Sequence, residues 1–182
     1  MGQTDPIQNG DLLARYYQIL NDLEIELPFL IATVYNLGKP TFTDMCETAC
    51  IGINELSQDL FYDWNASFFS KLKDEEVGFI ILHETLHLLL DHLGKSKAIK
   101  DNQRYNIACD IVINDWIMSD LISVKGLECL KAPKQIITGP SEFKRVLSLR
   151  AYTAEQVYAM LSDFNDISVA SGINRAGSGG IK

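Results

Sequence analysis

The segment from Val77 to Leu90 constrains the fold more than any other part of the chain, because it is apolar on every side of a helix and yet carries ionisable residues. An amphipathic surface helix would have a polar face, so a helix of this kind is predicted to be buried. The run His83-Glu84-Thr85-Leu86-His87 lies in its middle. Burying two imidazoles and a carboxylate without partners would cost several kcal/mol. The segment therefore predicts a buried helix whose polar residues meet a partner at the centre of the fold.

The spacing of these polar residues is typical of a metal site. The two histidines are four positions apart, so on a helix they differ by about 40° in direction and project to one side. Both can then bind one Zn²⁺ at about 2.0–2.1 Å. Glu84 follows the first histidine and can act as general base on a water bound to the metal, as the HExxH motif requires. We therefore predict that His83 and His87 bind zinc and that Glu84 is catalytic.

His92 is one candidate for the third protein ligand. The acidic residues 74–76 suit the start of a helix, and Gly94 is predicted to follow its last residue, so we expect a helix over residues 74–93. His92 would then point about 140° away from His87. It could bind the metal only if this helix ended early.

Asp110 is the rival candidate. It belongs to a second predicted helix, residues 105–121, in which Asn106, Asp110 and Asn114 are spaced four apart and form a polar stripe on an otherwise apolar segment. A buried polar stripe needs a polar counterpart, and the HExxH helix is the one that the sequence offers. The stripe favours Asp110 as the third ligand, with Asn106 and Asn114 as hydrogen-bonding partners of the metal-binding side chains.

The remaining patterns predict an α+β domain. We expect helices over residues 11–23 and 153–161, a strand over residues 29–35, and a hairpin of strands over residues 49–53 and 60–64. The helix over residues 153–161 opens with a capping box. These elements favour a zincin-like fold, in which a small, mostly antiparallel sheet packs against the HExxH helix. An edge strand of the hairpin could bind an extended peptide beside the metal.

Length, charge and cysteine content limit the number of domains, the kind of partner and the location that we expect. A chain of 182 residues is expected to form one domain, here residues 1–165, followed by a flexible Gly/Ser-rich tail, residues 166–182. The net charge of −8 argues against a nucleic-acid partner. The longest apolar run is far shorter than the roughly 20 residues that cross a bilayer. Four scattered cysteines predict free thiols in a reducing compartment, which makes the cytoplasm the expected location.

Taken in order, these segments resemble a family of predicted zinc metallopeptidases of bacteria and phages. The resemblance covers about residues 10–162, and the pattern HExxHxxxxH followed by NxAxDxxxN is more specific than HExxH alone. It implies hydrolysis of a peptide or protein substrate with zinc. It also implies a von Willebrand factor A-like domain, which relatives often carry and which could be a separate partner here. The residues that match the family's motif are His83, Glu84, His87, His92, Asn106, Asp110 and Asn114.

Two functions of different classes stay open. A metallopeptidase would keep one coordination position of the metal for water, whereas a catalytically silent zinc-binding interaction module would fill it with a fourth protein ligand. A peptidase also needs a donor to the oxyanion, and Tyr62, Tyr105 and Tyr152 are candidates among which the sequence does not choose.

Overall fold

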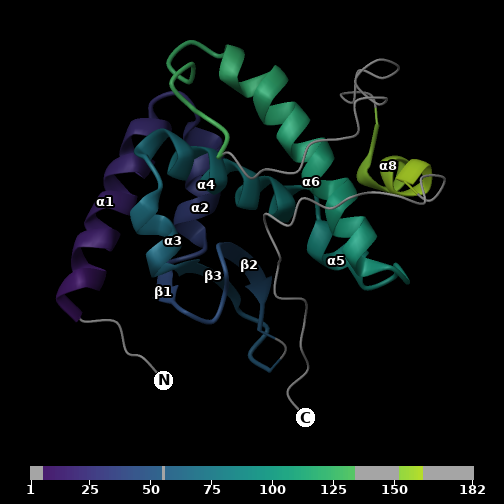
Figure 1. Ribbon diagram of the computed structural model, residues 1–182, viewed down its shortest axis with the longest axis horizontal. Coiled ribbons are helices and arrows are strands. Elements are labelled where there is room, and N and C mark those ends of the chain that lie inside the picture. Colours follow the sequence, from purple (N-terminus) through teal and green to yellow (C-terminus); the bar gives the residue numbers. More distant parts are fainter. Residues whose placement is uncertain (1–5, 55, 134–151, 162–182) are drawn as a thin grey trace.

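A computed structural model of the protein describes residues 6–54, 56–133 and 152–161. The fold is α+β, as predicted (Figure 1). Its helices are α1 (Pro6–Glu24), α2 (Pro28–Asn36), α3 (Ala66–Lys71), α4 (Asp74–Leu89), α5 (His92–Ser96), α6 (Asn102–Ser119) and α8 (Ala154–Leu161). Its strands are β1 (Thr41–Thr43), β2 (Ala49–Ile53) and β3 (Leu60–Asn65). A short 3-10 turn, Leu121–Ser123, follows α6.

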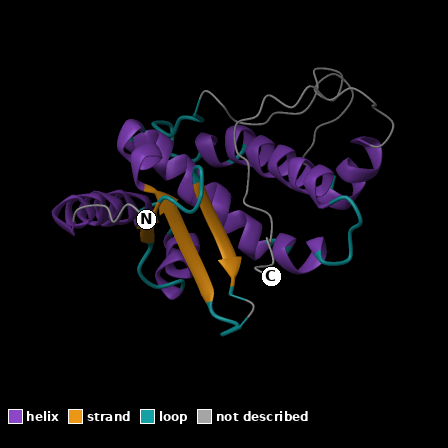
Figure 2. Ribbon diagram, turned by 60° about the horizontal axis from the view of Figure 1, so that its bottom comes forward, coloured by secondary structure: helices purple, strands orange, loops and turns teal. Residues whose placement is uncertain are grey.

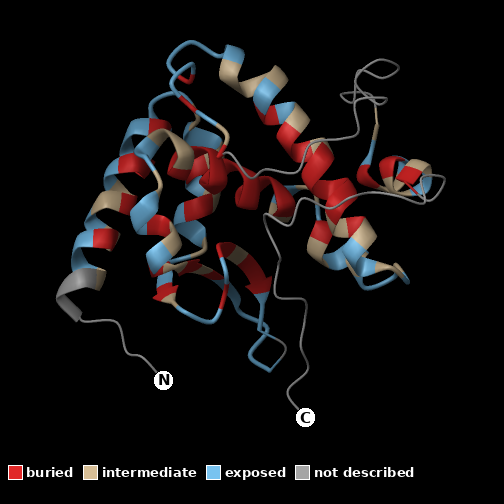
Figure 3. Ribbon diagram, viewed as in Figure 1, coloured by how far each residue is buried: buried red, intermediate tan, exposed pale blue. Residues whose placement is uncertain are grey.

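Helix α4 is the centre of the fold, with α1, α2, α6 and β2 packed against it (Figure 1). Every residue from Val77 to His87 is buried, and Figure 3 shows the same for much of α6. The apolar side chains of α4 join the main core, together with Trp64 and Phe69. The prediction of a buried helix is confirmed, so the polar residues of α4 lie at the centre of the protein.

The sheet is small and mixed (Figure 2). Strands β2 and β3 form the predicted hairpin, with Ala49 opposite Trp64 and Ile51 opposite Tyr62. These four side chains belong to the core. Strand β1 pairs in parallel with β3, so the sheet is mixed, and its antiparallel part is the β2–β3 hairpin. Three residues are too few to show the alternation that identifies a strand. The strand order β1-β3-β2 places β2 at an edge.

Residues 29–35 form most of helix α2, and the predicted strand there was wrong. The segment is rich in β-branched and aromatic residues, but only Ile31 and Val34 are buried, three positions apart on one helical face. Pro28 occupies the start of the helix, where its fixed φ angle favours helical geometry. Packing on α1 and α4 therefore outweighs the intrinsic preference of these residues for strands.

The HExxH helix ends four residues earlier than predicted. Helix α4 ends at Leu89, and Asp91 adopts the left-handed conformation, with φ 55° and ψ 36°. Asp tolerates this conformation better than most residues. The chain therefore turns at Asp91, and His92 begins the new helix α5 instead of continuing α4. Gly94 lies inside α5, where a Cβ atom would collide with the Asp91 carboxylate.

The other predicted helices are confirmed with shifted ends. Helix α6 begins at Asn102 because the Asp101 side chain accepts a hydrogen bond from the Arg104 backbone N–H. Helix α8 opens with the predicted capping box, formed by Thr153 and Gln156. The tail predicted over residues 166–182 lies outside the described residues. All four cysteines are free thiols, as predicted. Among the described helices, none combines the length and apolar character needed to cross a membrane.

Candidate metal centre

Three buried side chains converge between α4 and α6. Nε2 of His83 and Nε2 of His87 are 3.0 Å apart. Oδ1 of Asp110 lies 3.0 Å from Nε2 of His87 and 3.5 Å from Nε2 of His83. The ligand atoms of these residues all lie within 4.8 Å of one another. The polar stripe of α6 thus meets the HExxH motif, as the sequence suggested.

The separations between these atoms match those of metal ligands. Two atoms bound to the same zinc at about 2.05 Å, at a tetrahedral angle, are about 3.3 Å apart. The three separations of 3.0 to 3.5 Å bracket this value. Two imidazoles and a carboxylate are also donors that a borderline-soft divalent ion accepts. The donor set therefore fits a metal ion.

Asn114 determines which nitrogen of His83 faces the cluster. Its amide oxygen Oδ1 lies 2.9 Å from Nδ1 of His83. An amide oxygen can only accept a hydrogen bond, so Nδ1 carries a proton and Nε2 is the nitrogen that faces Asp110 and His87. The predicted contact of Asn114 with a histidine of the motif is therefore present, and its orienting role toward a metal-bound ring stays a prediction. Asn106, one turn before Asp110, is half-buried.

The three facing atoms of the cluster need a proton or a cation between them. Burial by itself would raise the pKa of Asp110, but hydrogen bonds with His83 and His87, and their positive charge, hold it well below its usual value. If neither Nε2 atom carried a proton, the two Nε2 atoms and the carboxylate would direct lone pairs at the same point, at only 3.0 to 3.5 Å. Either a proton on an imidazole or a cation must lie between them, and a metal ion satisfies all three side chains at once.

His92 approaches the cluster from the other side of the His87 ring. It is 5% exposed, and its Nδ1 lies 3.2 Å from Nδ1 of His87. The other nitrogen of His87, Nε2, is the one that faces Asp110. The early end of α4 at Leu89 and the turn at Asp91 produce this placement. The expectation that His92 points away from His87 was therefore wrong, although His92 lies outside the group of three converging ligands.

Glu84 lies within electrostatic reach of Cys50 on β2 and Tyr62 on β3. It is 1% exposed. Burial raises the pKa of Tyr62 on β3 well above its usual value, and the negative charge of Glu84 adds to this rise. Of the three tyrosines considered as oxyanion donors, Tyr62 is thus the one within electrostatic reach of Glu84. The hydroxyl of Tyr105 donates a hydrogen bond to Glu155, and Tyr152 lines a separate pocket.

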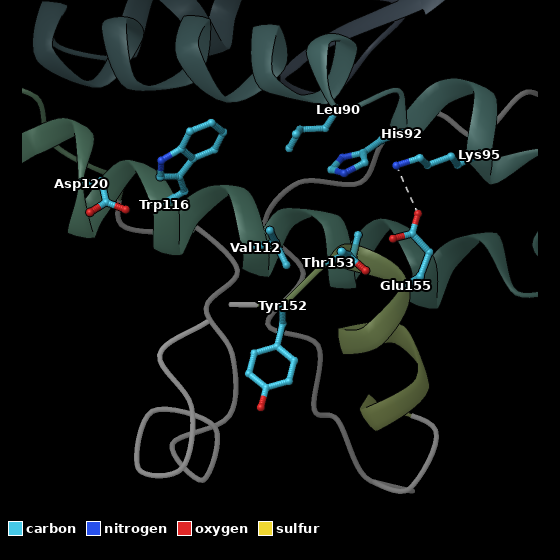
Figure 4. A pocket seen from close by; sticks show the side chains of 10 residues that line it. Leu90, His92, Lys95, Val112, Trp116, Asp120, Tyr152, Thr153 and Glu155 are labelled. Carbon is cyan, nitrogen blue, oxygen red and sulfur yellow. Dashed lines mark ion pairs between the residues drawn. The ribbon is translucent and has the colours of Figure 1, made fainter. Parts of the chain in front are cut away.

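That pocket lies next to His92 and was not predicted (Figure 4). Its volume is about 310 Å³. Apolar walls come from Leu90, Val112 and Trp116, and an ion pair of 3.3 Å between Lys95 and Glu155 closes one end. Sequence patterns could not reveal the pocket, because its walls come from the end of α4, from α5, from α6 and from the start of α8.

An α+β fold that brings a carboxylate from a neighbouring helix to two histidines of an HExxH helix defines a candidate metal-binding domain of the metallopeptidase class. The family assignment agrees with it. Residues 23–180 match the family described as "Putative metallopeptidase domain", and the chain belongs to this family. The predicted resemblance to metallopeptidases is thereby confirmed. Comparison with curated proteins and with solved structures gave no match.

Proposed function

We propose that this protein is a zinc-dependent metallopeptidase that hydrolyses peptide bonds. One observation carries the proposal: Nε2 of His83, Nε2 of His87 and Oδ1 of Asp110 converge on one buried point, next in sequence to a buried glutamate. Two histidines of an HExxH helix with one carboxylate form a donor set typical of catalytic zinc. The family to which the chain belongs supports the reaction class.

Each side chain has a distinct part in the proposed reaction. His83, His87 and Asp110 would hold the metal, and Asn114 keeps the His83 ring in the required tautomer. When bound, the metal supplies a Lewis acid that polarises the scissile carbonyl and acidifies a water molecule. Glu84 would take the proton from the attacking water and deliver it to the leaving amine. Tyr62, whose pKa responds to the charge of Glu84, would be the hydrogen-bond donor to the oxyanion.

We propose that the substrate binds as an extended strand along β2. Strand β2 is at the edge of the sheet and packs against α4. A peptide added at this edge would gain backbone hydrogen bonds with little dependence on its sequence. Its backbone would then run beside the HExxH motif, which is the placement that peptide hydrolysis requires.

The burial of the cluster favours a second candidate function, a zinc-binding interaction module without catalysis. His83, His87 and Asp110 are at most 5% exposed, and a closed, fully protein-coordinated metal is typical of structural sites. An exogenous ligand separates the two functions. Acetohydroxamate should change the visible spectrum of the cobalt-loaded protein if a coordination position is open, and should leave it unchanged if the site is closed.

The experiment that tests catalysis is a digest of a broad peptide library. Wild type, Glu84→Gln and chelator-treated protein are compared, with Glu75→Gln on the same helix as matched control. Removing a general base typically costs about 10²–10⁴ in rate, so Glu84→Gln should lose at least this factor while keeping its zinc. The control should cleave like wild type. Equal cleavage by wild type and Glu84→Gln would reject the mechanism.

A further inference from the structure

We propose that His92 is a positioning residue, which accepts a hydrogen bond from Nδ1 of His87 and thereby aims Nε2 of His87 at the metal. The inference rests on the metal site of the proposed function. It assigns to His92 a role other than that of a ligand.

The rings of His92 and His87 face each other through their Nδ1 atoms. Nδ1 of His92 lies 3.2 Å from Nδ1 of His87, while Nε2 of His87 lies 3.0 Å from Oδ1 of Asp110. A neutral imidazole has one N–H and one lone pair. If Nε2 of His87 gives its lone pair to the metal, its Nδ1 must carry the proton. That proton points at His92, whose Nδ1 is then the acceptor.

The two ligand histidines then have the same arrangement of hydrogen-bond partners. Nδ1 of His83 faces the amide oxygen of Asn114 at 2.9 Å, and Nδ1 of His87 faces His92. Each ligand ring thus has one acceptor behind it, and both Nε2 atoms face Asp110. Metal-binding histidines generally use their second nitrogen in this way, which fixes both the tautomer and the ring orientation.

Local structure holds His92 in this position. The left-handed conformation of Asp91 turns the chain so that His92 points back at α4. Its ring packs edge-on against Tyr105, with centroids 6.2 Å apart and an interplanar angle of 77°. Tyr105 is fully buried, and its hydroxyl donates to Glu155 on α8. The residue is therefore supported by α6 and α8 while it contacts a side chain of α4.

Nitrogen NMR of the zinc-loaded protein tests the proposal directly. The chain has three histidines, so each ring can be assigned. We expect both His83 and His87 to be zinc-bound at Nε2 and protonated at Nδ1, with the Nδ1 proton of His87 slow to exchange. His92 should show no zinc-dependent shift of a coordinated nitrogen. Coordination of zinc by His92, or by Nδ1 of His87, would overturn the proposal.

Two variants extend the test to metal affinity. His92→Leu keeps an apolar volume in place of the ring but removes the acceptor, and should weaken zinc binding about 10- to 100-fold, as loss of an orienting partner does. His92→Asn places an oxygen near the position of Nδ1 and should restore most of the affinity. The slow Nδ1 proton of His87 should be lost in the first variant and kept in the second. Asn114→Leu serves as the matched comparison at His83.

The zinc affinities of these variants distinguish a positioning role of His92 from a role as metal ligand and from no role in metal binding. Wild-type affinity in His92→Leu would overturn the proposal, and so would equal losses in His92→Leu and His92→Asn, which would indicate a ligand. If wild type bound zinc as expected but cleaved no peptide, the proposed peptidase activity would fail while the role of His92 stood. If wild type bound no zinc, the metal site itself would be rejected, and the role of His92 with it.

Discussion

Replacing Asp110 by Asn tests the proposed metal centre most directly. The substitution keeps the shape of a side chain that is 5% exposed, but it removes the charge that faces Nε2 of His87 at 3.0 Å and Nε2 of His83 at 3.5 Å. Loss of a residue that only orients a ligand weakens metal binding about 10- to 100-fold. Loss of the charged ligand itself should reach at least the upper end of this range.

A weaker affinity for zinc lowers the zinc-dependent part of the free energy of unfolding, because zinc stabilises the folded protein by binding to it. Free zinc at about 1,000 times the Kd stabilises the folded protein by about 4.1 kcal/mol. A site that binds about 100-fold more weakly would have only about tenfold excess at the same concentration, which gives about 1.4 kcal/mol. Asp110→Asn should therefore lose about 2.7 kcal/mol of zinc-dependent stabilisation. At about 2–4 °C per kcal/mol for a protein of this size, the Tm of the zinc-loaded form should rise about 5–11 °C less than in wild type.

The assay is thermal unfolding with and without zinc, each variant being compared with its own metal-free form. That comparison removes any effect of the substitution on the hydrogen bonds of the metal-free cluster. The matched control is Asp115→Asn on the same helix, about 140° around α6 from Asp110, which should keep the full zinc-dependent rise. A full rise in Asp110→Asn would refute Asp110 as a ligand, and equal losses in both variants would show that the effect is not specific to the site.

Three further predictions follow from the same structure. Protein purified without chelator should contain about one zinc per chain, and His87→Ala should contain none, because it lacks one of the three converging ligand atoms; elemental analysis measures both. Phe69→Ala should lower the free energy of unfolding by about 3–5 kcal/mol, since Phe69 is fully buried and packs edge-on against Trp64 and Phe42; urea titration tests this, and a loss below 1 kcal/mol would contradict it. Burial would raise the pKa of Glu155, but hydrogen bonds and Lys95 lower it from 4.5 to about 2, so its stabilising effect should be complete above about pH 4.5 and disappear as the pH falls through 2. The difference in unfolding free energy between wild type and Glu155→Gln should shrink over that window, and a constant difference would refute the assignment.

The sequence by itself determined the elements whose signal is local. The burial of α4 follows from apolar residues on all its sides, and the shared direction of His83 and His87 follows from the helical repeat. The β2–β3 hairpin and the start of α8 likewise follow from alternation and from the capping box. A polar contact of α6 was predicted from the stripe of Asn106, Asp110 and Asn114, because a buried polar face needs a polar partner wherever the chain places it.

Only the tertiary structure decided what depends on packing between distant segments. Residues 28–36 became a helix because their contacts with α1 and α4 outweigh the weak preference of β-branched residues for strands. The end of α4 depends on the backbone of Asp91, which adopts the left-handed conformation. The pattern of apolar residues along the sequence does not reveal this conformation. His92 consequently faces His87, and a pocket forms beside it between four elements. The distance from Asp110 to the two histidines is likewise fixed by how α6 packs on α4, and a pattern within one helix carries no information about such a distance.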